Sequence, residues 1–585
     1  MNLPKESCEN DYDRIVRSDI EAFREKAEDY LAGRLTDDEF RPFRLRRGIY
    51  GQRQPRVHMV RTKIPGGLLT AGQMRQLARI ADEFAAGRAH LTTRQNVQFH
   101  FVPLRRVADL LHMLADHRMT TREACYNTVR NITCDPMAGL AADEVFDVRP
   151  YAQRLALAFL HNELTDNLPR KFKIAFSGRE HDAAACAIHD IGLRAVIREG
   201  RRGFLMLVAG GLGPLPCEAR VLDEFVPEER LVARCEAVIR VFARHGNRKN
   251  KNLARLKFVL RERGFEWLKD AVEAEYRDIL ENGGIPVPEV IPEGFGGFLT
   301  SPPPPASGAS LPVLRNSPPD PAFDEWIGTN VAGQKQPGYA VVTAKVGQGN
   351  LTADQMRAAA DLAEHAGDGY LRLTIEQNLS IAFVRRENLR RAYAVLKFAG
   401  LADSGAGGIT DITTCPGAYS CNLALTKTMN LGEALEETVR DYADPLVRRL
   451  KIKASGCPNS CGQHWIGDIG FYGNSRRIEG REIPYYQMLL GGGHGRDGVL
   501  RFGLQAQSVP ARLAPEALRR VLDHYIANRA GEESFRDYVL RHRIETFRAL
   551  TNDLARPAEL EPEIYCDWGD EVAFSRQLGR GECAS

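Results

Sequence analysis

The sequence has no run of about 18 apolar residues, so no stretch of it could cross a membrane as a helix. It also lacks an excess of one charge: 79 Lys and Arg face 76 Asp and Glu, and the formal net charge of +3 is too small to favour nucleic acid. The N-terminus shows no basic, apolar and small-residue succession typical of a secretory signal. We therefore expect a cytoplasmic protein without a membrane or nucleic-acid partner.

Cysteine is scarce, with twelve in 585 residues. Without a secretory signal the thiols should stay reduced, so disulfides are not expected. Hydrophobic residues make up 43% and charged residues 26%, which is typical of a soluble globular chain and excludes a disordered or collagen-like one. At roughly 100–200 residues per domain, the length predicts three or four domains.

The chain contains a duplication. Residues 60–102 align without a gap to residues 342–384 at a constant offset of 282, and 18 of the 43 positions are identical. Weaker matches continue at 172–178 with 450–456 and at 206–211 with 488–493. The sequence is therefore two copies of one unit of about 250 residues, not an array of short repeats.

Each copy begins with alternating predicted elements. In the first copy, residues 57–64 alternate as a strand, Thr70 is placed to cap a helix over 71–86, and 97–102 is again strand-like. This succession predicts an α/β (α+β) fold. Longer helical patterns follow at 107–115, 152–163, 227–244 and 265–280. Residues 286–321 are rich in Pro, Gly and Ser and predict a surface linker between the copies; a recognition motif for a Pro-binding domain is the alternative.

Four of the twelve cysteines form two close pairs in the second copy. Cys415 and Cys421 are separated by five residues, and Cys457 and Cys461 by three. Four thiolates from two Gly- and Pro-containing loops favour an iron–sulfur cluster. A structural zinc is less consistent with the five-residue gap, and four buried free thiols are the remaining alternative. In the first copy only Cys134 corresponds to this set.

The first copy is rich in Arg and Lys where the second is not. Arg61 aligns with Thr343, Arg94 with Glu376 and His100 with Ala382. Further basic residues are Arg130, the segment 169–173 and the segment 246–257. A single Arg or Lys is often only a solvated surface group, but a set confined to one copy favours binding of an anion. No aromatic stacking platform accompanies the set, which disfavours nucleic acid.

These motifs together resemble a known family. TCPGAYSC and SGCPNSCG are similar to the two signatures of the sirohaem- and [4Fe–4S]-dependent sulfite and nitrite reductases. The first copy adds VRTKIPGG, LTTRQNVQFH, VRN and PRKFK, which resemble the haem- and anion-binding segments of that family in the same order. The resemblance extends over about residues 40–550.

The resemblance implies a three-domain fold built from two duplicated halves about a pseudo-twofold axis, with sirohaem at the junction. It implies the following division of the chain: an N-terminal extension over 1–56, paired ferredoxin-like half-domains over 57–124 and 340–407, a first sirohaem- and anion-binding domain over 125–285, a Pro-rich linker over 286–339, and a [4Fe–4S] and sirohaem domain with the C-terminal tail over 408–585.

It also implies roles for individual residues. Cys415, Cys421, Cys457 and Cys461 would hold the cluster, and Cys461 would in addition be the axial ligand of the sirohaem iron. The residues implied to surround the substrate anion are Arg61, Arg130, Lys171 and Lys173. The residues implied to meet the sirohaem are Arg94, His100, Asn131, Arg170, Arg248, Lys257, Gly210, Gly211 and Gly492. One departure is His90, where the family often has Arg.

The implied activity is the six-electron reduction of sulfite to sulfide, because PRKFK ends in Lys173 where nitrite enzymes of the family tend to have Asn. A ferredoxin-dependent nitrite reductase forming ammonia is the alternative, followed by a related cobalamin-pathway enzyme. In another class stand a non-haem iron–sulfur electron carrier and a zinc-stabilised binding protein. No nucleotide-binding fingerprint is visible, so we expect a reduced ferredoxin or a separate flavoprotein as electron donor.

The last expectation concerns Tyr50 and Cys125. Some members of the family carry a Tyr–Cys thioether beside the sirohaem, with the Tyr before the first anion-binding Arg and the Cys five residues before the second. Tyr50 precedes Arg61, and Cys125 lies five residues before Arg130. The spacing predicts that the two side chains are close together, and it leaves both a thioether and simple contact open.

Overall fold

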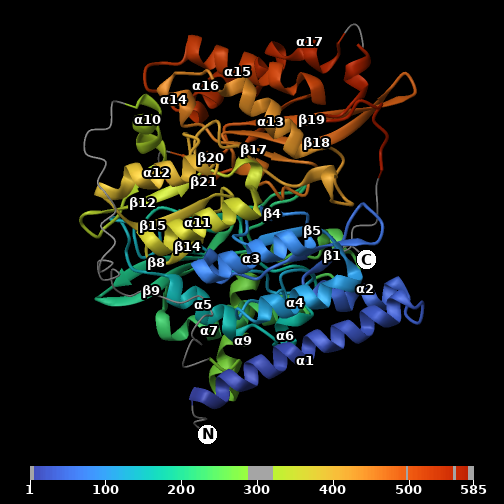
Figure 1. The fold of residues 1–585 in the computed structure, drawn as a ribbon, viewed down its shortest axis with the longest axis vertical. Helices are drawn as coiled ribbons and strands as arrows, with labels where there is room; N and C mark the ends of the chain where they lie inside the picture. Colours follow the sequence, from blue (N-terminus) through green and yellow to red (C-terminus); the bar gives the residue numbers. More distant parts are fainter. Residues whose placement is uncertain (1–4, 288–319, 496–497, 558–560, 578–585) are drawn as a thin grey trace.

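The computed structural model describes residues 5–287, 320–495, 498–557 and 561–577. The interior of the expected linker, residues 288–319, lies outside the described residues. Four five-stranded sheets form the framework, two in the half-domains and two in the larger α/β domains. In Figure 1 the last part of the chain, coloured orange to red, lies at the top, and the first helix runs along the bottom.

The two half-domain sheets exchange one strand each. The first sheet takes four strands from the first copy and its last from the second, in the order β1 (Ile49–Gly51), β2 (Val57–Arg61), β5 (Val97–Pro103), β4 (Arg88–Leu91) and β13 (Asn350–Thr352). The second sheet is the reverse, in the order β11 (Val331–Gly333), β12 (Tyr339–Ala344), β15 (Leu379–Arg385), β14 (Tyr370–Leu373) and β3 (Leu68–Thr70).

Both exchanged strands pair antiparallel, with Asn350 opposite His90 and Tyr370 opposite Thr70. Each exchanged strand runs directly into a helix, β3 into α3 (Ala71–Phe84) and β13 into α11 (Ala353–Ala366). Thr70 and Thr352 cap these helices with complete capping boxes, so the same local signal starts the helix in both copies. The exchange makes each half-domain incomplete without the other.

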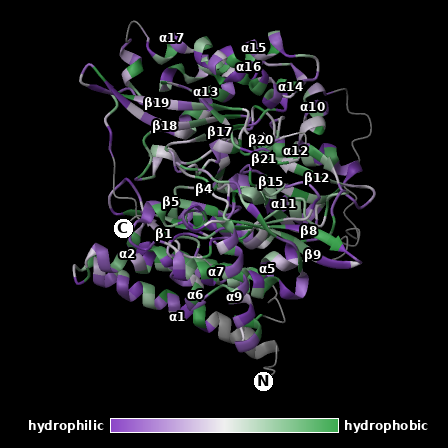
Figure 2. Cartoon of the chain, turned by 180° about the vertical axis from the view of Figure 1, so that it is seen from behind, coloured by the Kyte–Doolittle hydropathy of each residue, from purple (hydrophilic) through white to green (hydrophobic). Residues whose placement is uncertain are grey.

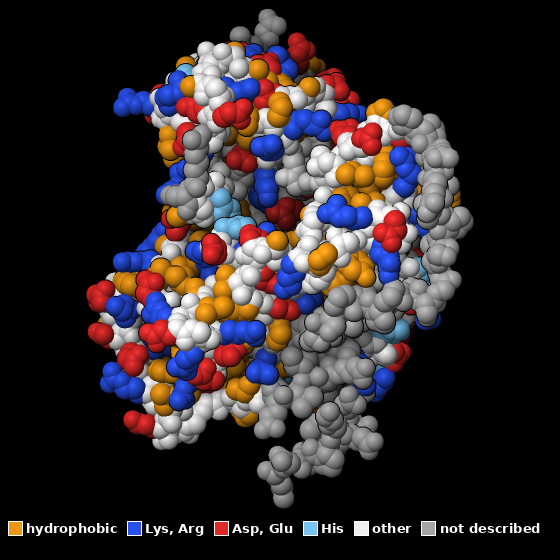
Figure 3. Space-filling view, turned by 90° about the vertical axis from the view of Figure 1, so that its left-hand side faces the viewer, with side chains coloured by type: hydrophobic (Ala, Val, Ile, Leu, Met, Phe, Trp, Pro, Cys, Tyr) orange, Lys and Arg blue, Asp and Glu red, His pale blue; other side chains and the backbone are white. Residues whose placement is uncertain are grey.

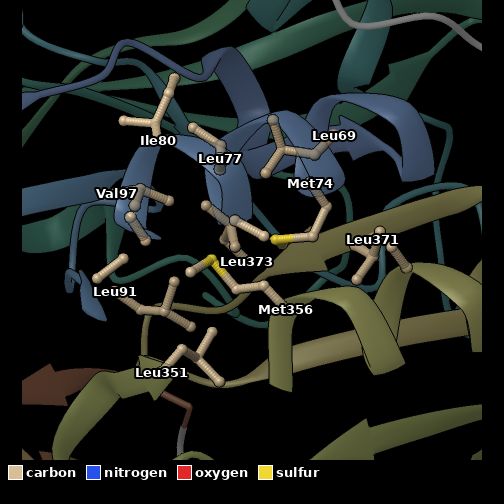
Figure 4. Packing of buried hydrophobic residues seen from close by; sticks show 14 of the residues in the cluster. Leu69, Met74, Leu77, Ile80, Leu91, Val97, Leu351, Met356, Leu371 and Leu373 are labelled. Carbon is tan, nitrogen blue, oxygen red and sulfur yellow. The ribbon is translucent and has the colours of Figure 1, made fainter. Parts of the chain in front are cut away.

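The two helices and their sheets bury one common core. Figure 4 shows Leu69, Met74 and Leu77 of the first copy meeting Leu351, Met356 and Leu373 of the second. All of these side chains are almost fully buried. The same core includes residues from the following surrounding helices: α1 (Lys5–Leu31), α2 (Asp37–Arg46), α4 (Val107–Ala115), α10 (Pro321–Asn330) and α12 (Leu389–Phe398).

The remaining two sheets have the same topology, parallel strands at one side and antiparallel strands at the other. The first-copy sheet has the order β10 (Arg220–Pro227), β9 (Arg201–Val208), β8 (Ile191–Arg198), β7 (Ile174–Ser177) and β6 (Thr133–Cys134). The second-copy sheet has the order β16 (Thr413–Thr414), β17 (Ile452–Ser455), β18 (Ile469–Ile478), β19 (Arg481–Leu490) and β22 (Leu504–Pro510). A separate two-stranded ribbon is formed by β20 (Gly493–His494) and β21 (Leu500–Arg501).

Helices accompany each of these sheets and complete two further cores. In the first copy they are α5 (Arg149–Ala158), α6 (Glu163–Asp166), α7 (Leu231–His245), α8 (Leu256–Arg263) and α9 (Phe265–Asn282). In the second copy they are α13 (Thr428–Val439), α14 (Pro445–Arg448), α15 (Ala514–Asn528), α16 (Phe535–Leu550) and α17 (Asn552–Ala555). Hydrophobic residues concentrate on the central strands, whereas the outer helix α1 is largely hydrophilic (Figure 2).

The predicted fold class, mixed helices and sheets in two duplicated halves, is confirmed. The structure differs from the predictions in two places. The predicted helix 152–163 breaks into α5 and α6, because His161 takes a left-handed conformation (φ +56°) and Asn162 caps a new turn. Residues 320–333, inside the expected linker 286–339, instead form α10 and β11, and Trp326 of α10 is fully buried in the half-domain core.

Met356 tests the shared core. Replacing Met356 with Ala leaves a cavity at the contact between the copies, and we expect it to lower the free energy of unfolding by about 2–5 kcal/mol. Met356→Leu conserves the volume and is expected to cost less than about 1.5 kcal/mol. Denaturant unfolding followed by circular dichroism measures both variants. Equal losses for the two variants would show that burial at this position does not hold the copies together.

Candidate functional site

The two cysteine loops meet because they follow neighbouring parallel strands. Cys415 comes directly after β16, and Cys457 comes two residues after β17. Thr414 pairs with Ala454 across these strands. The carboxyl ends of parallel strands lie at one edge of a sheet, so both loops begin at the same place.

Glycine lets the loops pack closely. A Cβ on Gly417, which has φ +56°, would lie 2.6 Å from the carbonyl oxygen of Thr426, and a Cβ on Gly456 would lie 2.7 Å from the same atom. A Cβ on Gly462, directly after Cys461, would lie 1.9 Å from the carbonyl oxygen of Ala454. No larger residue fits at these positions without moving the backbone.

The four thiols influence one another. Burial raises the pKa of Cys415, Cys421 and Cys457, and the neighbouring Cys461 raises all three further. The N–H of Gly456 donates to Cys415 Sγ at 3.3 Å. Thiolates that burial and mutual repulsion disfavour need a positive partner such as iron.

Among the described residues, no three or more His, Cys, Asp or Glu side chains are close enough to hold one metal ion.

The first copy reaches Cys461 through two segments. Thr93, in the turn between β4 and β5, donates from Oγ1 to the carbonyl oxygen of Cys461 at 2.9 Å. Lys173, just before β7, is close enough that the charge of Cys461 favours its protonated form. The LTTRQ and PRKFK segments of one copy therefore lie beside the second cysteine pair of the other.

Positive charge accumulates around Lys173. Burial, followed by Arg94, Lys171 and Arg255, lowers the pKa of Lys173 well below its usual value. Burial, followed by Arg130, also lowers the pKa of Arg94, to about 9, and Asp190 is the one group acting in the opposite direction among its main neighbours. A bound anion would relieve this repulsion.

Asp190 organises part of this set. Its carboxylate accepts from Arg255 Nη2 at 2.7 Å and from the backbone N–H of Lys173 at 2.8 Å, and it is fully buried. Arg94 donates from Nη1 to Thr133 Oγ1 at 3.1 Å and also contacts His189 Nε2. These contacts fix the direction of the guanidinium groups before any ligand binds.

Arg61 and Arg130 form the other side of the set. With its side-chain amide turned over to suit its neighbours, Gln98 accepts from Arg61 Nε at 2.8 Å and donates to His100 Nε2 at 3.3 Å. Burial lowers the pKa of His100 to about 3, so its imidazole is neutral near pH 7 and contributes a hydrogen bond instead of a charge. Arg130 donates from Nη1 to the carbonyl oxygen of Ala124 at 2.9 Å.

Tyr50 and Cys125 share these arginines as neighbours. Arg61 Nη1 lies 3.8 Å from Cys125 Sγ, and the Arg61 guanidinium lies 5.6 Å from the centre of the Tyr50 ring. Arg130 Nη2 donates to Tyr50 Oη at 3.3 Å. The side chains of Tyr50 and Cys125 therefore border the same part of the site.

Some polar atoms near the cysteine and arginine segments are buried without a hydrogen-bond partner among the described residues. In the first copy they are Arg94 Nε, His100 Nδ1 and Asn131 Oδ1. The second copy adds Thr414 Oγ1, Ser460 Oγ, Gln463 Oε1 and both ring nitrogens of His464. Unpaired buried atoms also lie far from these segments, for example Trp326 Nε1. Near the cysteines and arginines, such atoms can pair with a bound group rich in carboxylates or in sulfur.

Four residues expected to contact the sirohaem differ from Arg94 and His100 in their position or in their hydrogen bonds. They are Arg170, Arg248, Lys257 and Asn131. Arg248 is exposed and donates to the carbonyl oxygen of Asn167, and it lies with Arg170 near Lys251. Lys257 spends its ammonium group on the carbonyl oxygens of Gly211, Leu212 and Leu215, so it holds the loop after β9. The amide nitrogen of Asn131 donates to three backbone carbonyl groups, which leaves only its oxygen for a ligand.

Two of the three glycines expected to contact the sirohaem, Gly210 and Gly492, are explained by backbone packing within the protein itself. A Cβ on Gly210 would lie 2.5 Å from the carbonyl oxygen of Ala187, and one on Gly492 would lie 2.4 Å from that of Gly467. Only Gly211 faces site side chains, at 3.2 Å from Arg255 and Lys257. His90, the departure from the family pattern, contacts Asn350 Oδ1 at 3.0 Å across the exchanged strand, and burial lowers its pKa to about 4. His90 is therefore not a cation near pH 7.

Sequence reasoning missed Thr93, His189 and Asp190 as site residues. The repeat contained a signal for Asp190, because Asp190 corresponds to Asp468 in the second copy. Each of these carboxylates accepts the backbone N–H of a Lys that precedes the neighbouring strand, Lys173 in the first copy and Lys451 in the second. Thr93 had no such signal, since its partner is a backbone atom of the other copy.

Figure 3 shows one face of the molecule hollowed between its upper and lower parts, with Lys, Arg and His side chains and also Asp and Glu side chains around the hollow.

Comparison with known proteins decides the family. A model described as the nitrite and sulphite reductase 4Fe-4S domain matches residues 125–280 and 405–557, and one described as the nitrite/sulfite reductase ferredoxin-like half domain matches 50–117 and 332–399. The chain belongs to the nitrite and sulfite reductase family. It is thus an oxidoreductase whose cofactors are sirohaem and a [4Fe–4S] cluster, as the resemblance implied.

Individual relatives carry both substrate names. An assimilatory ferredoxin-dependent nitrite reductase of Haloferax mediterranei is 30% identical over 561 residues, covering 92% of each chain. A sulfite reductase [ferredoxin] of Mycobacterium tuberculosis is 28% identical over 498 residues, covering 83% of each chain. The solved structure of the NirA protein of M. tuberculosis matches with a TM-score of 0.75 at 26% identity, over 90% of this chain and 95% of that one.

No helix among the described residues is long and apolar enough to cross a membrane.

Cys461 and Cys134 provide a matched test of the metal ligands. We expect Cys461→Ser to lose the magnetic coupling between the two cofactors, because it removes the thiolate that the family resemblance assigns to both. Cys134→Ser should keep the cluster, since the buried Cys134 thiol belongs to the first copy. Iron and sulfide content and electron paramagnetic resonance (EPR) spectra measure both. Undiminished coupling in Cys461→Ser would contradict the shared ligand.

Mass spectrometry of peptides distinguishes a thioether between Tyr50 and Cys125 from simple contact between the two side chains. Two linked peptides would weigh two hydrogen atoms less than the two free peptides together. Detection of both free peptides, with no linked species, would show that the side chains are only neighbours.

Proposed function

We propose that this chain catalyses the six-electron reduction of sulfite to sulfide. The observation that supports this proposal most strongly is the group of cations beside Cys461: Arg94, Lys171 and Arg255 all disfavour the protonated form of Lys173, and Asp190 is the acidic neighbour of Arg94 and Arg255. A dianion gains more from such a group than a monoanion does, because the attraction grows with the charge.

The proposed substrate-binding residues are Arg61, Arg130, Lys171 and Lys173. Their N–H groups would donate to the oxygens of the anion and stay paired with these oxygens as protons arrive and water departs. Arg61 and Arg130 are oriented by Gln98 and by the carbonyl oxygen of Ala124, so little reorganisation is needed on binding.

The cofactors would be held on both sides of this group. Cys415, Cys421, Cys457 and Cys461 are the proposed cluster ligands, with Cys461 also ligating the sirohaem iron. Arg94, His100 and Arg170 are the proposed partners of the sirohaem carboxylates. Arg248 lies exposed, the ammonium group of Lys257 is bonded to backbone carbonyl groups, and Asn131 has only an accepting oxygen left, so these three are not proposed as carboxylate partners. When bound, the sirohaem supplies the iron that takes the substrate and the cluster supplies the electrons.

Nitrite is the second candidate substrate. The relative from Haloferax mediterranei is named a nitrite reductase and is slightly more similar to this chain than the named sulfite reductase is. Nitrite also takes six electrons at the same cofactors, so the cysteine motifs do not separate the two. Both names specify ferredoxin, and we propose reduced ferredoxin as the donor here, with a separate flavoprotein as the alternative.

Steady-state assays with a reduced viologen donor test the substrate. We expect kcat/KM to be higher for sulfite than for nitrite, because the cation group compensates a dianion better. A higher kcat/KM for nitrite than for sulfite would contradict this proposal and would identify nitrite as the substrate. A purified protein without a sirohaem absorption band, despite confirmed cofactor supply, would favour a non-haem electron carrier.

Lys173→Asn tests the charge argument. The variant loses one charge-assisted hydrogen bond of about 1.5–3 kcal/mol, so sulfite turnover should fall roughly 10–100-fold, and nitrite turnover should fall less. Lys451→Asn is the matched control: Lys451 takes the corresponding place before β17, where it pairs with Glu376 at 3.3 Å instead of joining the cation group. An unchanged sulfite-to-nitrite ratio in Lys173→Asn would contradict the assignment.

A further inference from the structure

A short segment of the N-terminal region lies against the first cysteine loop. We call residues 52–54, directly after β1, the N-terminal strap. The backbone N–H of Arg53 donates to the carbonyl oxygen of Ser420 at 3.0 Å. Gln54 Nε2 donates to that of Tyr419 at 2.9 Å. Arg53 Nη2 donates to that of Ala424 at 2.6 Å. These three bonds hold the backbone on both sides of Cys421.

The same guanidinium also reaches the end of the described chain. Arg53 Nη2 donates to the carbonyl oxygen of Gln577 at 3.2 Å. Phe101, near the C-terminal end of β5, packs edge-on against Tyr419, and the centres of the two rings are 5.2 Å apart. The cysteine loop is thus fixed by groups distant in sequence, and Arg53 is the charged one among them.

The charge of Arg53 lies against the loop that carries Cys421, because Arg53 bonds to the carbonyl oxygens of Ser420 and Ala424. Within the described residues the Arg53 guanidinium contacts carbonyl oxygens and no carboxylate. Its Nε is buried and has no hydrogen-bond partner among the described residues. A positive charge with an unused donor therefore lies beside the Cys421 loop.

We propose that Arg53 is a positioning residue of the [4Fe–4S] cluster, which holds the Cys421 loop in place and stabilises the reduced cluster by its charge. The proposal rests on the cluster, not on the choice between sulfite and nitrite. Reduction adds one negative charge to the cluster, and a nearby cation stabilises that charge more than it stabilises the oxidised form. At partial burial, removing such a charge should change the ratio of reduced to oxidised cluster about tenfold at a fixed potential.

The test is a redox titration of the holoenzyme followed by EPR, which reads the reduced cluster directly and needs no substrate. Arg53→Gln removes the charge, and Arg53→Lys keeps it while losing the guanidinium geometry. Arg56→Gln is the matched control, because Arg56 is an exposed Arg three residues further along the same segment. Iron and sulfide content shows whether each variant assembles its cluster.

At the parent's midpoint potential, we expect the ratio of reduced to oxidised cluster to be about tenfold lower in Arg53→Gln than in the parent, while Arg53→Lys and Arg56→Gln stay close to the parent. Equal shifts in Arg53→Gln and Arg56→Gln would overturn the proposal, since any surface charge would then have the same effect. A shift in Arg53→Lys as large as in Arg53→Gln would overturn it too, by showing that geometry alone matters. If Arg53→Gln assembles no cluster, Arg53→Lys decides: a parent-like potential supports the charge role, and a shifted one refutes it.

Discussion

Repulsion among like charges is the constraint on which the site depends. Arg94 and Lys173 are held close to further cations, and the groups that favour their protonated forms are Asp190 for Arg94 and Cys461 for Lys173. Such a set is unfavourable in the isolated protein, and it persists because the sheets and turns that carry it are stabilised elsewhere, in three separate hydrophobic cores. The thiols present the complementary problem, because burial opposes their ionisation. The carboxylates of a bound sirohaem would reduce the repulsion among the cations, and the iron of a bound cluster would stabilise the buried thiolates.

The two copies show how one scaffold diverged. Arg94 of the first copy corresponds to Glu376 of the second, while Asp190 and Asp468 keep the same backbone contact. In the second copy Glu376 pairs with Lys451, so that side of the pseudo-twofold has balanced charge. The architecture was therefore retained in both copies while the side chains diverged: the cations lie in one copy and the two cysteine pairs in the other. The contact from Thr93 to Cys461 joins the two.

Much of the fold and the centre of the site could be predicted from sequence because their signals are local. The capping Thr70, the β-branched and apolar run of β2 and the spacing of Cys415 to Cys461 depend on neighbouring residues alone. The expected alternation over 57–64 is wrong, because three successive residues of β2 are buried and the strand ends at Arg61. The rest depends on contacts between distant segments. Trp326 belongs to a short helix after a Pro-rich stretch, and only the half-domain core explains why it is buried. Lys257 and Arg248 look alike in sequence, yet one holds a buried loop and the other lies at the surface.

The strand exchange between the half-domains has a consequence for the history of the molecule. A chain with a single copy would have β3 and its helix projecting from its own sheet, and the natural place for them is the equivalent sheet of a second, identical chain. Such an ancestor would be an obligate homodimer with two identical catalytic centres. Fusion of the genes removed the requirement that both centres be equal. One catalytic centre could then lose its ligands while the other stayed active. Mutations could also improve the remaining centre alone, whereas in a symmetric homodimer every mutation occurs in both centres.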